Sequence, residues 1–391
     1  RICAIRRARC CWSSPTTEAT AAASEPLLFG GMTASPPDPG VRPEAAAGRR
    51  AGWRRLLDDL TEVRSAPHAH RVAVRAATSL LVPLLALWGL GRLDLSVYAT
   101  FGAFASVYGG GVVTASRWRT QARLGAILAA ASVSGALVGL SPVRGWLAIP
   151  VAAGWASLAA ALSDRQRWRP PGPMFPVFAV ATCAAIPGTP ALVLQGAVVV
   201  TATAAFAVGL GAAEVWLRDR AGRPPDPPAP SGPPMPRAER QRIQLIRCGV
   251  VVAVAGLLAT LAGIGHPYWA VVASVAPLTV FTFRGQLVRG VHRAVGTLLG
   301  VAVSAGLLLA PLPVPAMLLV AAGLFACAEL LVVRHYGAAL VVITPLALLS
   351  MQVAHPEPVG VLVMDRLIET LIGVAVGLLA AVITRDRAAP G

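Results

Sequence analysis

Long apolar runs recur along the chain and limit what it can fold into. A helix that crosses a bilayer needs about 20 mostly apolar residues, and most of these runs approach that length. Turn residues or arginines separate one run from the next. The runs cover residues 74–90, 95–113, 124–140, 146–162, 174–186, 191–217, 250–264, 268–283, 294–309, 314–333, 337–353 and 359–383. The sequence therefore predicts an all-α polytopic membrane protein with about 12 transmembrane helices.

The composition agrees with a membrane protein. Of the 391 residues, 55% are hydrophobic and 13% are charged, whereas a soluble domain has about 25% charged residues. A soluble globular protein is thereby excluded. The fifth run, 174–186, is short and contains Pro176, so a spanning helix and a re-entrant helix both remain open for it.

Positive charge is distributed along the chain and does not gather in one stripe. The formal net charge is +16, and all 34 basic residues are arginines. Without a basic stripe we expect no nucleic-acid partner. The arginines recur in alternate loops, for example at 117–123, 165–169 and 284–293. Because cytoplasmic loops carry the excess of basic residues, we expect a multi-pass protein of the cytoplasmic membrane with both termini in the cytoplasm.

The N-terminal region differs from the rest of the chain. Residues 1–50 are rich in small and polar residues and are predicted to be disordered. Residues 1–31 resemble untranslated low-complexity sequence, so Met32 is the expected start. Residues 51–70 have leucines at helical spacing opposite charged residues, which predicts an amphipathic juxtamembrane helix. Both a location at the membrane surface and packing on protein remain open.

The chain divides into two similar halves. A proline-rich stretch, PPDPPAPSGPPMP, lies within residues 218–241 and predicts an extended cytoplasmic linker. It separates residues 71–217 from residues 242–387. Matches at a spacing of 170 residues join Tyr98 to Tyr268, Arg119 to Arg289 and Arg123 to Arg293. With six runs in each half, the sequence predicts two parallel six-helix repeats.

Small residues recur every fourth position in several runs. Gly296, Gly300 and Ser304 form one such face, and Gly373 and Gly377 belong to another. Small residues at this spacing let helices approach closely in lipid. We therefore interpret these faces as packing surfaces.

Charges inside apolar runs are candidates for function because they are costly in a bilayer. Glu329 is a candidate for proton coupling, and the alternative is an ion pair with Arg334 or a neighbouring helix. Asp365, Arg366 and Glu369 can face one side of a helix. Both a proton relay and a self-neutralised structural cluster remain open for these three. Glu214 is interpreted as an interfacial anchor, and Tyr268 and Trp269 as part of an outer aromatic belt.

Two arginine pairs repeat in the two halves. Arg119 and Arg123 are one helical turn apart, as are Arg289 and Arg293. Their guanidinium groups fit carboxylates, so the pairs could form an electropositive mouth that binds anions. The alternative is that they serve topology alone.

Three segments together resemble a known family. They are HPYWAVVASVAPL (266–278), RGQLVRGVHRAVGTLLG (284–300) and DRLIETLIGVAVGLLAAVI (365–383). This part of the chain resembles the FUSC family, the fusaric-acid-resistance-like integral membrane transporters, which are related to aromatic acid exporters. The resemblance is clearest in the second half and covers about residues 72–387.

This resemblance implies two six-helix repeats and export of aromatic or other organic anions. Members often carry a sizeable cytoplasmic domain between the halves, where this chain has the proline-rich linker. The implied signature positions are Tyr268, Trp269, Arg289, Arg293, Gly296, Gly300, Asp365 and Arg366.

We therefore expect an integral membrane transporter that exports small carboxylates. On this hypothesis the arginine pairs attract the anion, the anion passes between the repeats, and Glu329 couples the step to the proton gradient. A passive anion channel and a non-transporting accessory or scaffold subunit are the alternatives. The sequence has no nucleophile and base at a usable spacing and no metal motif, so we expect no enzyme, cofactor or metal. Membrane lipid and an organic anion are the expected partners, and a homo-oligomer remains open.

Overall fold

The computed structural model describes residues 56–66, 69–110, 117–223 and 238–385. The predicted disordered segment 1–50, with the expected start at Met32, lies outside these residues, as do residues 224–237 of the proline-rich linker. The described residues all belong to one compact unit.

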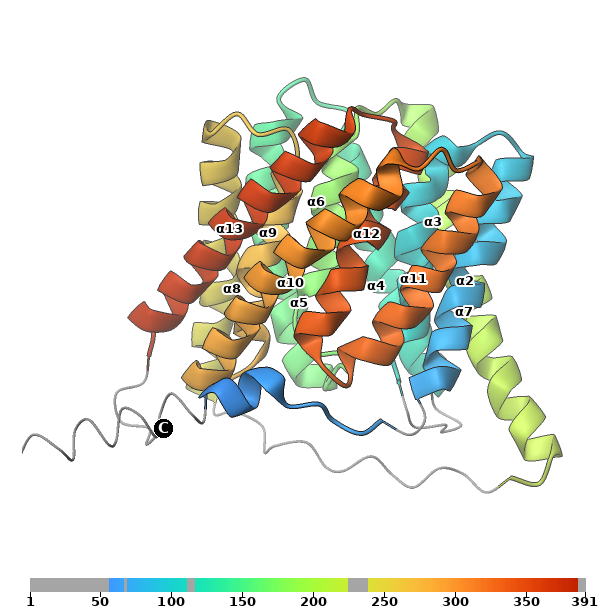
Figure 1. Cartoon of the computed structure of the whole chain (residues 1–391), viewed down its shortest axis with the longest axis horizontal. Helices are drawn as coiled ribbons and strands as arrows, with labels where there is room; N and C mark the ends of the chain where they lie inside the picture. The colour runs from blue at the N-terminus through green and yellow to red at the C-terminus, as the bar shows by residue number, and fades with distance from the viewer. Residues whose placement is uncertain (1–55, 67–68, 111–116, 224–237, 386–391) are drawn as a thin grey trace, which may run out of the picture. The chain divides into compact units, whose positions relative to one another are not determined.

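Helices account for nearly all of the described structure, and Figure 1 shows most of them running side by side. The first half contains α2 (Ala69–Gly89), η1 (Leu93–Leu95), α3 (Ser96–Ala103), η2 (Phe104–Val107), α4 (Arg117–Val138), α5 (Arg144–Gln166), α6 (Met174–Ala185) and α7 (Pro190–Arg220). The second half contains α8 (Ala238–Leu261), α9 (Tyr268–Val275), η3 (Pro277–Thr279), α10 (Phe283–Leu309), α11 (Val314–Val332), α12 (Tyr336–Ala354) and α13 (Val359–Ile383).

Nine helices in the described part of the chain are long and apolar enough to cross a membrane. The other three apolar segments, Leu93–Val107, Met174–Ala185 and Tyr268–Thr279, are shorter than a span requires. The second and eighth predicted runs are thus corrected to short helices. Pro277 ends α9 early because it has no backbone N–H to continue the helix. The fifth run is also too short to cross alone.

The short helices α3 and α9 are enclosed by protein. All eight residues of α9 are buried, and seven of the eight residues of α3 are buried. Short helices leave backbone carbonyls unpaired at their ends, which lipid cannot satisfy. Burial among neighbouring helices allows side chains to supply the missing donors.

In the first half, these donors come from α2 and α4. Arg75 on α2 donates from Nε and Nη2 to the backbone oxygen of Ser106, at 3.2 and 3.0 Å. Gln121 on α4 donates to the backbone oxygens of Ser106 and Tyr108, at 3.3 and 3.1 Å. The backbone oxygens of Ser106 and Tyr108, which follow the short helix inside the protein, are therefore paired.

In the second half, the corresponding carbonyls lie after α9. Gln244 on α8 donates to the backbone oxygen of Leu278 at 2.6 Å. Gln286 on α10 donates to the backbone oxygen of Val280 at 2.9 Å. The two halves therefore stabilise their short helices with polar side chains from the preceding and following long helices.

Glycines bring α10 close to α12. A Cβ atom at Gly296 would lie 2.6 Å from the backbone oxygen of Gly337, and one at Gly300 would lie 2.9 Å from that of Leu340. A Cβ at Gly373 or Gly377 on α13 would likewise overlap the backbone of α9. The interpretation of these faces as packing surfaces is confirmed.

One helix of each half packs against a helix of the other half. Helix α2 of the first half packs against α11 of the second half, and α8 packs against α5. Within each half, α4 packs against α6 and α7, and α10 packs against α12 and α13. The halves therefore form one helical body and are not separate bundles.

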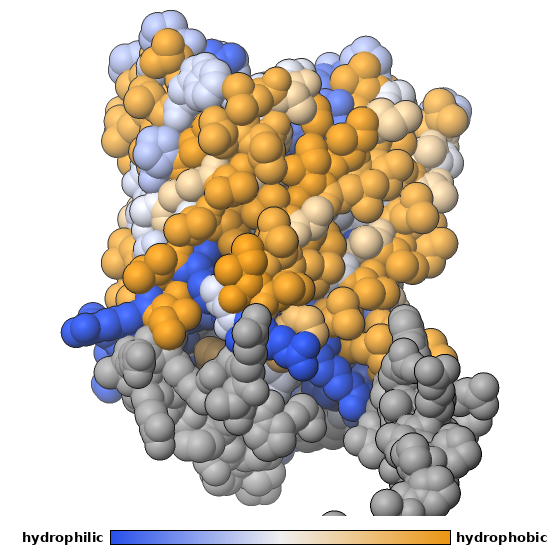
Figure 2. Space-filling view, turned by 90° about the vertical axis from the view of Figure 1, so that its left-hand side faces the viewer, coloured by the Kyte–Doolittle hydropathy of each residue, from blue (hydrophilic) through white to orange (hydrophobic). Residues whose placement is uncertain are grey.

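Large apolar side chains cover the outside of the helices. Figure 2 shows them on one face, between hydrophilic side chains at its two ends. Many leucines and valines are more than one-third exposed, including Leu257, Leu371 and Leu379. An exposed apolar surface of this extent requires lipid as its solvent.

Residues 56–66 lie across the end of the helices at which α10 and α12 begin (Figure 1). Of the predicted amphipathic helix 51–70, the described part is helical over 56–61 and not over 62–66. The backbone oxygen of Leu60 lies 3.0 Å from His292 Nε2 and 2.8 Å from His335 Nε2. Asp59 forms an ion pair with Arg284. We call this end, which also carries Arg64 and Arg334, the arginine-rich end.

Candidate functional site

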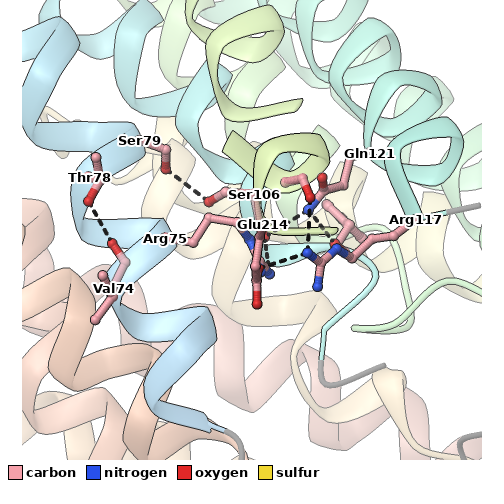
Figure 3. Close-up of polar contacts among 10 residues, drawn as sticks. Val74, Arg75, Thr78, Ser79, Ser106, Arg117, Gln121 and Glu214 are labelled. Carbon is pink, nitrogen blue, oxygen red and sulfur yellow. Dashed lines mark hydrogen bonds and ion pairs between the residues drawn. The ribbon is translucent and has the colours of Figure 1, made fainter. Parts of the chain in front are cut away.

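Three helices of the first half bring a carboxylate and two arginines together (Figure 3). Arg75 lies on α2, Arg117 begins α4, and Glu214 lies on α7. Each guanidinium places an Nη atom 2.7 Å from Glu214 Oε2. Both arginine side chains are buried, and Glu214 is 22% exposed. We call these residues, with Ser106 and Gln121, the Glu214 cluster.

The Glu214 cluster uses its arginines to hold helices together. Arg117 also donates to the backbone oxygen of Gly211 at 3.1 Å, and Arg75 also donates to that of Ser106. Both guanidinium groups therefore have a carboxylate and a carbonyl as partners. Glu214 is an interhelical bridge and not the interfacial anchor that we predicted. The sequence signal was an acidic residue at the end of the apolar part of α7, but its partners lie about 100 or more residues away.

Glu329 lies close to this cluster. It is buried on α11, the helix that packs against α2, and it interacts electrostatically with Arg75. Arg334 donates to the backbone oxygens of Leu330 and Ala66. Among the described residues, Glu329 and Arg334 form no ion pair, and the interaction with Arg75 agrees with the other form of the structural alternative, a contact with a neighbouring helix.

A second group of polar residues surrounds Arg366 in the second half. Arg366 is buried on α13, and its guanidinium carbon lies 4.9 Å from the centre of the Trp269 ring. Arg366 also interacts electrostatically with four other residues. These are Tyr268 on α9, Arg293 on α10, Tyr336 on α12 and Glu369 on α13. We call these four residues, with Arg366 and Trp269, the Arg366 cluster.

The Arg366 cluster contains many buried polar atoms without a hydrogen-bond partner. They are Tyr268 Oη, Trp269 Nε1, Arg293 Nε, Tyr336 Oη, Arg366 Nε and Glu369 Oε2. Within the described part of the chain, the guanidinium groups of Arg293 and Arg366 make no hydrogen bond or ion pair. Buried polar groups are normally paired, so each exception needs an explanation. The Arg366 cluster thus differs from the Glu214 cluster, where the arginines are paired.

His266 connects this cluster to the end at which α13 begins. Its Nδ1 lies 2.9 Å from Asp365 Oδ2, and its Nε2 lies 3.2 Å from Glu357 Oε2. The ring stacks on Trp269 with centroids 4.9 Å apart, and the backbone N–H donates to Glu369 Oε1 at 3.0 Å. We did not single out His266 from the sequence. The position between Gly265 and Pro267 was the only local signal.

The structure corrects the interpretation of Tyr268 and Trp269, and it bears on the two alternatives left open for Asp365, Arg366 and Glu369. Tyr268 and Trp269 are 3% and 0% exposed, so they are core residues and not part of an outer aromatic belt. Asp365, Arg366 and Glu369 do not neutralise each other by direct pairing. Asp365 faces His266, and the described residues contain no ion pair between Arg366 and either acid.

The two predicted arginine pairs lie in different environments. Arg119 and Arg123 are exposed, and Arg119 stacks on Trp118 at 5.4 Å. Arg289 is half-buried, with its guanidinium carbon 4.6 Å from the centre of the Tyr336 ring. Arg293 is buried in the Arg366 cluster. Among the described residues, no hydrogen bond, ion pair or ring contact brings the four arginines together, although the pairs match in sequence.

The described residues hold no group of three histidine, cysteine, aspartate or glutamate side chains that could bind a metal ion. The site contains instead an excess of hydrogen-bond donors, from guanidinium, phenol and indole groups. Such a set suits an oxyanion.

The helices and their apolar surface define a polytopic α-helical membrane protein. Residues 253–380 match the family model described as fusaric acid resistance protein-like. This match assigns the second half of the chain, which contains the Arg366 cluster, to the FUSC family. No curated protein and no solved structure matches the chain. The family and the apolar helices together indicate a membrane transporter.

Proposed function

We propose that this protein exports small organic anions, and in particular aromatic carboxylates, across the cytoplasmic membrane. The observation that carries the proposal is the pair of buried arginines, Arg293 and Arg366, that lack a direct partner. A buried charge is strongly unfavourable unless it is paired. The carboxylate of a bound anion would supply the missing partner.

The donors of the Arg366 cluster support a carboxylate as the ligand. A guanidinium group presents paired N–H donors that fit the two oxygens of a carboxylate. The hydroxyl groups of Tyr268 and Tyr336 and the indole N–H of Trp269 can supply further hydrogen bonds. The aromatic part of the anion is inferred from the FUSC family resemblance. His266 and Arg366 already contact the ring of Trp269.

The route of the anion follows from the positions of the arginines. Arg293 is ten residues into α10, about 15 Å along the helix from the arginine-rich end. Half-buried Arg289 lies one turn closer to that end. We propose that Arg289 and Arg293 receive the anion from the cytoplasm. The exposed Arg119 and Arg123 do not bind the anion directly. They contribute to a positive electrostatic potential at the protein surface, which attracts anions.

We further propose that the two halves are parallel six-helix repeats. The support is that equivalent helices make equivalent contacts. The contact of α2 with α11 corresponds to that of α8 with α5, and the contact of α4 with α7 corresponds to that of α10 with α13. Glu329 stays a proposed coupling residue. The placement of the arginine-rich end and both termini in the cytoplasm is also a proposal, supported by the arginines of alternate loops.

Efflux of a labelled aromatic carboxylate from proteoliposomes tests the proposal, with and without an imposed proton gradient. We expect saturable efflux by the wild-type protein. Arg293→Gln should raise the apparent KM about tenfold or more, because a hydrogen bond to a charged group contributes roughly 1.5–3 kcal/mol.

Arg123→Gln is the matched control, since Arg123 aligns with Arg293 but is exposed. Its effect should be small and should disappear at high salt, where exposed charges are screened. Equal effects of the two variants would contradict a buried binding site. An electrical current that depends on the anion gradient alone would indicate a passive anion channel. Folded protein that transports no anion would favour a non-transporting accessory or scaffold subunit.

A further inference from the structure

Glu369 is the one carboxylate of the Arg366 cluster, and its two oxygens have different surroundings. Oε1 accepts a hydrogen bond from the backbone N–H of His266 at 3.0 Å. Oε2 is buried and has no hydrogen-bond partner. An ionised carboxylate is strongly disfavoured in such a place, whereas a proton on Oε2 removes the charge. The geometry fits a protonated Glu369.

Arg366 gives independent support for a neutral Glu369. The two residues are three positions apart on α13, and side chains at this spacing are neighbours. An ionised carboxylate beside a free guanidinium would form a strong, charge-assisted hydrogen bond. The described structure contains no such pair between them, although both side chains are buried. A neutral Glu369 leaves the Arg366 guanidinium free.

Titratable groups connect Glu369 to the end at which α13 begins. Asp365 lies one helical turn before Glu369 and faces His266. The other nitrogen of the His266 ring faces Glu357, which is 38% exposed. The groups that act on Glu369 itself are Tyr268 on α9, Asp365 and Arg366 on α13, and the backbones of His266 and Trp269. Arg293 on α10 and Tyr336 on α12 act on Arg366, and Glu357 faces His266.

We propose that Glu369 is a proton-binding site linked to anion binding at Arg366. While Glu369 carries its proton, Arg366 is free to bind the carboxylate of the anion. When the proton leaves toward Asp365 and His266, the Glu369 carboxylate pairs with Arg366 and displaces the anion. At pH values where Glu369 is ionised in the free protein, each anion therefore binds together with one proton from solvent. The inference rests on the proposed function for the identity of the anion.

Calorimetry on the purified full-length protein tests the linkage, with benzoate as the probe. Binding enthalpies measured in two buffers of different ionisation enthalpy give the number of protons taken up. We expect about one proton per benzoate where Glu369 is ionised in the free protein, and an affinity that falls up to about tenfold per pH unit there. Binding without proton uptake at any pH would overturn the proposal.

Two variants test which carboxylate takes up the proton when benzoate binds. Glu369→Gln mimics the protonated side chain, so it should bind benzoate with an affinity that no longer depends on pH. Glu329→Gln is the comparison, since Glu329 is the other buried carboxylate near an arginine, and it should keep the linkage. If Glu329→Gln abolished proton uptake and Glu369→Gln did not, Glu369 would not be the linked site.

A measurement without any anion separates this inference from the proposed function. The infrared difference spectrum between wild type and Glu369→Gln at neutral pH should contain the carbonyl band of a protonated carboxyl group. If benzoate and related anions fail to bind but the band is present, the proposed function fails and the proton site stands. Absence of the band overturns the proton site.

Discussion

Arginine has two different roles at the scale of single residues. In the Glu214 cluster, Arg75 and Arg117 share one carboxylate and join three helices. In the Arg366 cluster, Arg293 and Arg366 are as deeply buried but have no such partner. A paired buried arginine contributes to the fold, while an unpaired one is a cost that a ligand can remove. Pairing, and not burial, therefore separates the two roles.

This difference predicts opposite effects on stability. Glu214→Gln should destabilise the protein by about 2–3 kcal/mol, because it leaves Arg75 and Arg117 without a counter-charge. The effect is below that of a fully buried pair because Glu214 is 22% exposed. Arg293→Gln should be neutral or stabilising, since it removes an unpaired charge. Thermal unfolding in detergent compares them, and a larger loss for Arg293→Gln would contradict the assignment.

The sequence predicted part of the site and could not predict the rest. Arg366 and Glu369 were identifiable because charges within apolar runs stand out. Arg293 was identifiable because its spacing from Arg289 repeats at Arg119 and Arg123. Their neighbour His266 was not, since it lies in a loop about 100 residues from Asp365 along the chain. Glu214 was misinterpreted for the same reason. Hydropathy places a residue along the membrane normal but does not indicate which helices face each other.

At the scale of elements, the sequence predicted all twelve apolar segments but overestimated the length of two of them, 95–113 and 268–283. Hydropathy continues past the ends of α3 and α9 because the following residues are apolar too. The helices end earlier because the backbone turns there, at Gly109 with a φ of 76° and at Pro277. Short helices are tolerated only where protein surrounds them. That enclosure is a property of the packing and is not visible in one segment.

Close packing of α10 on α12 gives a prediction at this scale. Gly296→Ala should destabilise the protein by about 1–3 kcal/mol, because the new methyl group would overlap Gly337 and Leu340. Gly306→Ala on the same helix is the matched control, since a Cβ there meets nothing within 4 Å. It should stabilise by about 0.5–1 kcal/mol through helix propensity. Unfolding temperatures measure both, and equal effects would mean that α10 and α12 are not in close contact.

At the scale of the whole molecule, the two halves share their packing but differ in charge pairing. Helices α2 and α8 each pack on a helix of the other half, so neither half completes the body alone. Such an arrangement could place an equivalent site in each half. The exposed Arg123 and the buried Arg293 show that equivalent sequence positions did not become equivalent environments.

This asymmetry predicts one anion site per chain. Among the buried arginines of the described residues, Arg293 and Arg366 have no hydrogen bond or ion pair, whereas Arg75 and Arg117 already pair with Glu214. Calorimetric titration with benzoate should therefore give a stoichiometry of about one per chain, because a pre-paired site must first lose its own ion pair. Arg366→Gln should remove this binding, while Arg119→Gln should leave the stoichiometry unchanged. Two benzoate sites of similar affinity would contradict the prediction. They would show that the Glu214 cluster also binds anions and that both halves of the chain carry an anion site.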